Sequence, residues 1–315
     1  GAMTWVSDPK LVSTVSNAGG FGALAGGNAP VDELNRQIEE TKSLTDKPFG
    51  VNLITIAPNY RLQLQLMQKI EFPFVTFAGG FPRQEEIQGI KSYGGKVLCF
   101  ASTESIAHRM LRYGADGIIL EGSEAGGHVG HVSLTILLQQ VLFRVEDVPV
   151  FVAGGIATGK LCAHLLLMGA AGIQMGTRFA MAKESIAHPR FKEKFMRANA
   201  RDAVSTPQFD SRLPVVAVRA LRNKGLDEFG HLQLQLIQQI DSGTISRQEA
   251  QEKVEEFWVG ALRRAVMDGD IATGSLMAGQ SVGLVDRIMS VQEIIDEITT
   301  AIESELQRVK QDLCE

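Results

Sequence analysis

The sequence predicts an α/β fold of the (β/α)8 (TIM) barrel type that carries a helical insertion. Two observations carry this prediction. Short, nearly continuous apolar runs alternate with helix-like stretches, and the repeat is roughly 22–30 residues long, the size of one βα unit. Most of these runs also end in small residues, and much of the chain's glycine, 32 residues in all, follows them. Strands that are apolar throughout are typical of a parallel sheet covered on both faces.

The predicted strands can be read off in chain order. They are FGALAGG (21–27), FGVNLIT (49–55), FPFVTFAGG (72–80), KVLCFA (96–101), GIILEG (117–122), PVFVAGG (149–155) and GIQMGTRF (172–179). The stretches between them predict helices at 31–44, 60–70, 82–93, 105–114, 133–145 and 159–169. Cys99 lies in the fourth run, where a small core residue is the expected role and a nucleophile the weaker alternative.

One strand of the predicted barrel is not visible in the sequence. A closed barrel needs eight strands, whereas residues 1–20 read as a loop followed by a helix. The first strand is therefore expected just before Gly1. An open, doubly wound sheet is the alternative that the same alternation allows.

The pattern changes after residue 184. Residues 186–271 show no clear strand and several helical stretches, among them SRQEAQEKVEEFWVGALRRAVMDG, which begins with a predicted capping box of Ser246 and Glu249. An amphipathic helix is expected at 290–310. We therefore divide the chain into a barrel (1–184), a helical insertion that covers the site (185–272) and a return to the barrel with the closing helix (273–315).

Composition narrows the functional classes. The net charge is −5 and no long Lys/Arg block appears, so nucleic acid is not an expected partner. The three cysteines are far apart and lack metal-ligand spacing, which predicts no metal site and favours a reducing compartment. No apolar run approaches the ~18 residues of a membrane span. A soluble cytoplasmic protein is the expectation.

Two neighbouring strand ends predict a phosphate site. AGGIATG (153–159) and GIQMGTRF (172–179) both place glycines where a strand turns into a helix. In barrels the active site lies at this end of the strands, and the last two turns commonly hold phosphate through backbone N–H groups. Glycines that merely permit tight turns are the alternative for each motif alone.

The segment EGSEAGGHVG (121–130) places His128 among glycines directly after a strand. Gly126, Gly127 and Gly130 leave the backbone bare there, which suits close approach by a ligand. No HxH or HxxxH ligand pair includes His128, and His131, three residues on, has no acidic or cysteine partner nearby in the sequence. General acid/base chemistry is therefore favoured over metal binding, with a structural role as the alternative.

These segments together resemble the nitronate monooxygenase (2-nitropropane dioxygenase) family and its relative, the flavin-dependent enoyl-acyl-carrier-protein reductase II. The resemblance rests on VSNAGGFGALAGGNAP (15–30), SLTDKPFGVN (43–52), EGSEAGGHVG, VFVAGGIATG, IQMGTRF followed by AKESIAHP, and GSLMAGQSVGLV (274–285). It covers nearly the whole chain and implies an FMN-containing barrel with a helical insertion. Family members carry a strand before the stretch that matches GAM, which is the strand not seen here.

The resemblance also implies a set of site residues. His128 is implied as the catalytic histidine. The implied FMN-binding residues are Met3, Asn52, Glu121, Gly126, Gly127, Gly155, Gln174, Met175, Gly176, Thr177, Met277 and Gln280. Gly155 and the 174–177 run are expected at the phosphate, and Met277 and Gln280 are expected to close the site.

The function that the resemblance implies first is oxidation of alkyl nitronates with O₂ to a carbonyl compound and nitrite. The alternative is reduction of an enoyl thioester or a quinone by NAD(P)H, towards which SLTDKPFGVN leans. An acyl-carrier protein is acidic, so its docking would use a basic patch, and the residues that could form one are Arg190, Lys192, Lys194, Arg197 and Arg201. A solvated helix face is the alternative reading of that cluster. A homodimer is a candidate assembly.

Overall fold

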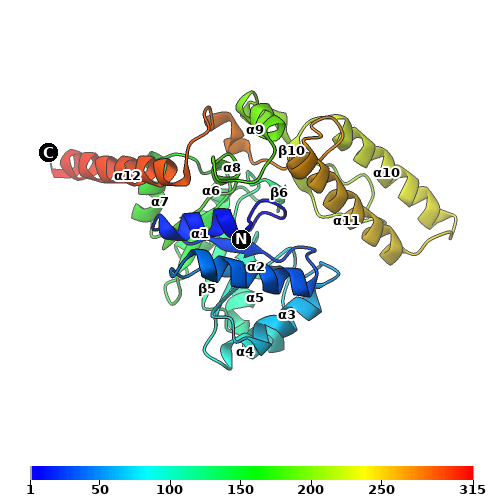
Figure 1. The fold of residues 1–315 in the computed structure, drawn as a ribbon, viewed down its shortest axis with the longest axis horizontal. Coiled ribbons are helices and arrows are strands. Elements are labelled where there is room, and N and C mark those ends of the chain that lie inside the picture. Colours follow the sequence, from blue (N-terminus) through cyan, green and yellow to red (C-terminus); the bar gives the residue numbers. More distant parts are fainter. Residues whose placement is uncertain (1, 315) are drawn as a thin grey trace.

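A single parallel sheet forms the centre of the molecule. A computed structural model describes residues 2–314 (Figure 1). The seven strands of this sheet are β1 (Ala23–Ala25), β2 (Gly50–Ile54), β3 (Phe74–Ala78), β4 (Lys96–Ala101), β5 (Gly117–Glu121), β7 (Val150–Ala153) and β8 (Gly172–Gln174). Every one of the predicted strands is present, and most are shorter than their apolar runs because the flanking glycines belong to turns.

The order of the strands separates the two predicted architectures. Each strand of this sheet pairs in parallel with the sheet's next strand along the chain, so the spatial order of its strands equals their chain order. A doubly wound sheet reverses direction at a switch point, whereas a barrel does not. The sheet therefore has barrel order. Within residues 2–314, β1 and β8 are its two edges and do not pair with each other, and an eighth strand that closes it stays a prediction.

Helices alternate with the strands: the first precedes β1, and each of the others connects two successive strands of the sheet. They are α1 (Pro9–Asn17), α2 (Val31–Leu44), α3 (Tyr60–Lys69), α4 (Gln84–Lys91), α5 (Glu104–Tyr113), α6 (Leu134–Leu137), which continues as a π-helix over Leu138–Leu142, and α7 (Gly159–Leu167). Several begin at a side-chain cap: Asp8, Thr103 and Thr158 each accept a hydrogen bond from the backbone N–H three residues on. The predicted helix positions are confirmed to within a few residues.

Side chains alternate across the sheet. Val51, Leu53, Val75 and Phe77 are completely or almost completely buried on the face that packs against the helices. The residues between them, such as Asn52 and Thr76, face the space that the sheet surrounds, because a strand has a period of two. Cys99 belongs to the packed face, and its expected core role is confirmed. Cys99 is 1% exposed, and this burial raises the pKa of its thiol to about 12, which disfavours the thiolate that a nucleophile needs.

The region after β8 differs from the prediction in one respect. It contains α8 (Thr177–Ala180), α9 (Pro189–Met196), α10 (Lys224–Asp241), α11 (Arg247–Arg263) and a π-helical turn over Arg264–Asp268, but also β9 (Ala203–Ser205) and β10 (Val218–Leu221). These strands pair antiparallel with β6 (Gly127–His128) in the order β6-β10-β9. The expectation of no strand in 186–271 was therefore wrong. Strands of three or four residues are too short to show an alternation in the sequence.

Helices α10 and α11 form a hairpin that projects from the barrel (Figure 1). They enclose a separate apolar cluster that includes Phe229, Val254 and Trp258. The predicted capping box is confirmed: Ser246 Oγ accepts from the N–H of Glu249, and the Glu249 carboxylate accepts from the N–H of Ser246. The closing helix α12 (Val291–Cys314) packs against α7 and extends beyond the expected 310. The assignment of 185–272 as a separate insertion stays a prediction.

Candidate active site at the carboxyl ends of the strands

The curled sheet surrounds a cavity of about 1430 Å³. Inward-facing residues of all seven strands line it: Ala23, Asn52, Thr76, Leu98, Ile119, Phe151 and Ile173. At one end lie the loops that follow the strands, and at the other lie residues near the strand starts, such as Lys96 and Pro149. The part at the carboxyl ends of the strands is lined by polar side chains and glycine-rich turns, and this is where a barrel places its active site.

The predicted site residues converge on this part of the cavity. Its lining includes Met3, Asn52, Glu121, Gly126, Gly127, His128, Gly155, Gln174, Met175, Gly176, Thr177 and Met277. Gln280 does not line it, although its neighbours Gly279 and Ser281 do. The backbone N–H of Gln280 instead donates to the carbonyl of Glu124 at 2.9 Å, which holds the returning chain against the loop after β5.

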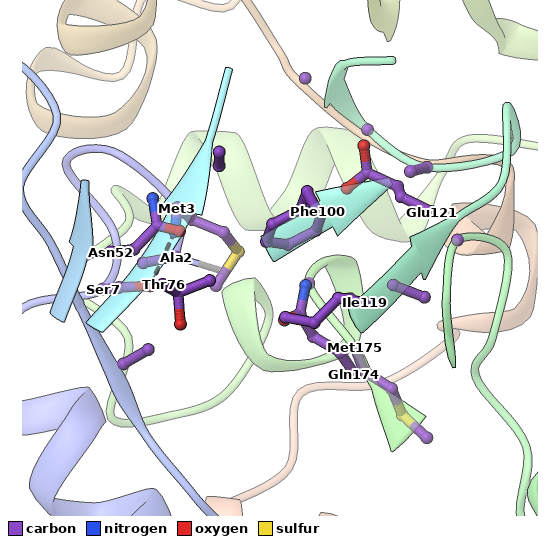
Figure 2. A pocket seen from close by; sticks show the side chains of 18 of the residues that line it. Ala2, Met3, Ser7, Asn52, Thr76, Phe100, Ile119, Glu121, Gln174 and Met175 are labelled. Carbon is purple, nitrogen blue, oxygen red and sulfur yellow. Dashed lines mark hydrogen bonds between the residues drawn. The ribbon is translucent and has the colours of Figure 1, made fainter. Parts of the chain in front are cut away.

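Figure 2 shows how side chains from distant segments face one space. Met3, from the N-terminal segment, and Asn52, from β2, lie on one side, with Thr76 beside them; Glu121, Gln174 and Met175 lie on the other. The backbone N–H of Met3 donates to Ser7 Oγ at 2.9 Å, which fixes the turn that brings the thioether into the cavity.

Asn52 carries a polar atom without a partner. Its side chain is 1% exposed, and Oδ1 has no hydrogen-bond partner among residues 2–314. Buried polar atoms are rarely left unpaired in proteins. An orphan acceptor that lines a cavity therefore indicates a donor on a bound ligand.

Glu121 ends β5 and faces the same space (Figure 2). Its side chain keeps some accessible surface because it borders the cavity, yet protein atoms surround it. This burial raises the pKa of its carboxyl group to about 7. Glu121 can therefore be present as a neutral acid, and thus as a hydrogen-bond donor, near neutral pH.

Three glycines of EGSEAGGHVG (121–130) are needed for different structural reasons. A Cβ on Gly126 would come within 2.5 Å of the backbone of Ala278 and Gly279, and one on Gly130 within 2.4 Å of Ser102. These two glycines allow neighbouring loops to touch. Gly127 has a φ of +76°, a left-handed conformation that other residues rarely adopt. Gly126 and Gly130 therefore serve loop packing, whereas Gly127 serves the turn itself, and all three line the cavity.

The two strand-end turns of the predicted phosphate site lie side by side, because β7 pairs with β8. Gly154 and Gly155 have φ values of +98° and +71°. A Cβ on Gly176 would meet nothing closer than Met3 Sδ at 3.6 Å, so the wall there is open backbone. Thr177 starts α8, and its hydroxyl accepts from the N–H of Gly279 at 3.1 Å. The two turns thus bring backbone groups of Gly155, Gly176 and Thr177 to one wall of the cavity.

His128 stands at the mouth of the cavity. It belongs to β6 and pairs with Val218 of β10, so the small antiparallel sheet fixes its backbone. Its Nε2 atom is buried and has no hydrogen-bond partner among residues 2–314. The nearest charged atom to it is Glu255 Oε2, at 3.7 Å. The imidazole is thus held beside the open turn at Gly127 and faces the same cavity as Asn52 and Gly176.

Helix α11 supplies site residues that the sequence did not reveal. Glu255, Trp258, Val259 and Leu262 all line the cavity. The apolar spacing of this helix is visible in the sequence, but one helix carries many glutamates and only the fold shows which of them meets His128. Phe100 and Ser102, at the end of β4, were also missed, because neither belongs to a recognisable motif.

The basic cluster of the sequence is only partly a surface. Lys192 is buried and donates to the carbonyls of Ala182 and Ser185, so it holds α9 in place and cannot join a docking patch. The exposed members are Arg190, Lys194, Arg197 and Arg201. Nearby, His188 caps α9 by accepting a hydrogen bond from the N–H of Arg190. Across residues 2–314, each helix is too short or too polar to cross a bilayer.

Known proteins share both the sequence and the fold. The family model described as nitronate monooxygenase matches residues 1–61 and 54–301. A curated relative from Rhodococcus jostii, "(3aS,4S,5R,7aS)-5-hydroxy-7a-methyl-1-oxo-octahydro-1H-indene-4-carboxyl-CoA dehydrogenase", is 31% identical over 94% of this chain and 89% of its own. A probable nitronate monooxygenase from Bacillus subtilis is 27% identical over 93% and 92%.

Solved structures agree with these matches. FabK from Thermotoga maritima superposes with a TM-score of 0.86 and is 37% identical, covering 99% of this chain and 94% of its own. A nitroalkane oxidase from Streptomyces ansochromogenes has a TM-score of 0.81 and is 26% identical, covering 98% and 95%. Coverage is nearly complete in both directions, and the motifs that line the cavity fall within the matched residues. The chain therefore belongs to the nitronate monooxygenase family of oxidoreductases.

Proposed function

We propose that the chain is an FMN-dependent nitronate monooxygenase, which oxidises alkyl nitronates with O₂ to a carbonyl compound and nitrite. The observation that carries the proposal is the shared cavity of His128, the orphan acceptor of Asn52 and the bare turns at Gly155 and Gly176. This is the combination that a flavin site with an adjacent acid/base group needs.

The residues present fit FMN. Asn52 Oδ1 is an unpaired acceptor that suits a ring N–H of a flavin. The backbone of Gly155, Gly176 and Thr177 suits a terminal phosphate, while Met3 and Met277 offer apolar surface to a planar ring. The sequence has no GxGxxG turn for the ADP part of FAD, which favours FMN.

When bound, the flavin supplies the redox chemistry, and His128 handles the proton. Neutral imidazole can take the proton from the carbon next to the nitro group of a neutral nitroalkane. A nitronate that arrives already as an anion has no such proton to lose. The glycine turn at Gly127 leaves space for the reacting carbon beside the imidazole.

Reduction of an enoyl thioester by NAD(P)H is the second candidate. Two observations favour it. Identity is higher to FabK, at 37%, than to the nitroalkane oxidase, at 26%. Two curated relatives, at 31% and 32% identity, have names that specify a carboxyl-CoA dehydrogenase. In this case protonated His128 would deliver a proton to the substrate carbon, and exposed Arg190 and Lys194 could meet an acidic carrier protein.

A spectroscopic experiment separates the two candidates. The purified protein is denatured to identify the released flavin, and the native protein is then mixed without oxygen with either NADH or NADPH or with a nitronate alone. Loss of the oxidised flavin spectrum with the nitronate alone supports the monooxygenase. Rapid loss with a nicotinamide, followed by recovery with an enoyl thioester, supports the reductase. Release of FAD, or of no flavin, contradicts both.

A further inference from the structure

An acidic side chain from the insertion meets the proposed acid/base histidine. Glu255 lies on α11, more than a hundred residues after His128, and its Oε2 atom is 3.7 Å from His128 Nε2. The two side chains are 29% and 25% exposed, so the pair is partly shielded from water. The separation is too long for a hydrogen bond, and the contact becomes an ion pair when the imidazole takes up a proton.

Both partners are held by rigid elements. Val254 and Trp258 on α11 are 3% and 2% exposed and pack in the apolar cluster between α10 and α11, which fixes the rotation of the helix. Trp258 and Val259, one turn beyond Glu255, border the cavity with it. On the other side, β6 is paired with β10, and the N–H of Val129 donates to the carbonyl of Ala217 at 2.9 Å.

The other charged groups near His128 are engaged elsewhere or lie deeper. The Glu124 carboxylate accepts from the N–H of Leu134. The Arg219 guanidinium, beside the β6 pairing, donates to the carbonyls of Ser123 and Ala203. Glu121 lines the same cavity at the end of β5, and His131 is exposed beyond the loop. Glu255 is thus the carboxylate that directly faces the imidazole.

We infer that Glu255 is a positioning residue that orients the imidazole of His128 and stabilises its protonated form, so that the helical insertion takes part in the proton chemistry. The inference rests on the proposed acid/base role of His128. A carboxylate beside Nε2 favours the tautomer with its proton on that nitrogen, which leaves Nδ1 to exchange a proton with the substrate. The positive charge that forms on the ring then has a counter-charge.

The test compares Glu255→Gln with Glu256→Gln. The control removes the same charge from an exposed neighbour on the same helix. Without its counter-charge, the imidazolium of the Glu255 variant needs a lower pH to form. We expect the limb of the pH–rate profile that depends on His128 to move to lower pH by roughly half a unit. Turnover that requires proton transfer should fall roughly three- to tenfold, whereas flavin content stays unchanged.

A measurement on the protein without flavin gives a second readout. The NMR titration midpoint of the His128 imidazole should move to lower pH in Glu255→Gln and stay in place in Glu256→Gln. Glu255→Asp should restore part of the shift because it keeps the charge, and it replaces the Gln variant if that one does not fold. In the His128→Ala background, Glu255→Gln should cause no further loss of turnover.

The outcomes keep the two proposals apart. If His128→Ala is defective while Glu255→Gln behaves as Glu256→Gln in rate, pH profile and titration, the role of Glu255 is refuted and that of His128 stands. If His128→Ala itself has normal proton-dependent turnover, the proposed function of His128 is refuted first.

Discussion

The hydroxyl of Thr177 accepts a hydrogen bond from the backbone N–H of Gly279 at 3.1 Å. The two residues are far apart in the chain, and this contact joins the start of α8, next to β8, to the segment between α11 and α12. Gly279 also approaches Glu124 so closely that a Cβ would come within 2.9 Å of its carbonyl oxygen. One side of the proposed phosphate cradle therefore depends on a segment more than a hundred residues downstream.

Thr177→Val should loosen that contact. The change removes the acceptor and leaves the N–H of Gly279 unpaired, at a cost of about 1–3 kcal/mol. We expect urea denaturation to show this loss and the Kd for FMN to rise about tenfold. Thr135→Val, at an exposed threonine of α6, is the matched control. Equal Kd values in both variants would show that the contact does not support the cradle.

Gly176→Asp should abolish flavin binding in a folded protein. The site has space for a Cβ, since its nearest atom is Met3 Sδ at 3.6 Å, so a side chain fits without clash. A carboxylate there would face the phosphate and repel it. Flavin released per chain is the measurement, with circular dichroism as the test of folding.

Gly176→Ala serves as the control for size, and it should keep most of the flavin because it adds no charge. A Gly176→Asp protein with full flavin content would contradict the assignment of this turn to the phosphate.

Glu121→Gln should stabilise the flavin-free protein at neutral and alkaline pH. The pKa of the carboxyl group rises from 4.5 to about 7 on folding because the group is buried. Below pH 4.5 it is protonated in both states and costs nothing. Between pH 4.5 and 7 the carboxyl group loses its proton in the unfolded state but keeps it in the folded state, so the stability of the wild type falls as pH rises. Above pH 7 the loss in the free energy of unfolding is constant, at up to about 3 kcal/mol.

The measurement is the free energy of unfolding of both proteins at pH 4, 6 and 8. The advantage of the Gln variant should be absent at pH 4 and largest at pH 8. Glu256→Gln, which changes an exposed carboxylate, should show no such trend. A constant difference between the Gln variant and wild type across this range would contradict the buried, neutral acid.

Much of the fold could be predicted from the sequence because its signals are local. Apolar runs such as KVLCFA mark the barrel strands, and Ser246 with Glu249 marks the start of α11. The short β9 and β10 were not predictable, since their partner β6 lies far away in the chain and pairing, rather than propensity, makes them strands.

The candidate site likewise contains residues that local sequence predicts and residues that only the fold reveals. Candidate residues such as Asn52, His128 and Gly176 could be predicted because their segments carry glycine patterns or a family resemblance, and all three line the cavity. Glu255 was not, because a glutamate on an amphipathic helix looks like a solvated residue until the fold brings it to His128. The burial of Lys192 was hidden for the same reason, since its two carbonyl partners come from the preceding loop.

The central claim is that His128 moves the proton while flavin does the redox chemistry, and His128→Ala tests it most directly. The variant is compared with wild type on a neutral nitroalkane and on its preformed nitronate, with flavin content measured in parallel. We predict normal flavin content, a loss of roughly 10²–10⁴-fold with the neutral nitroalkane, and a much smaller loss with the nitronate. Equal activity of the two proteins on both substrates would contradict the account and leave His128 as a structural residue of its loop.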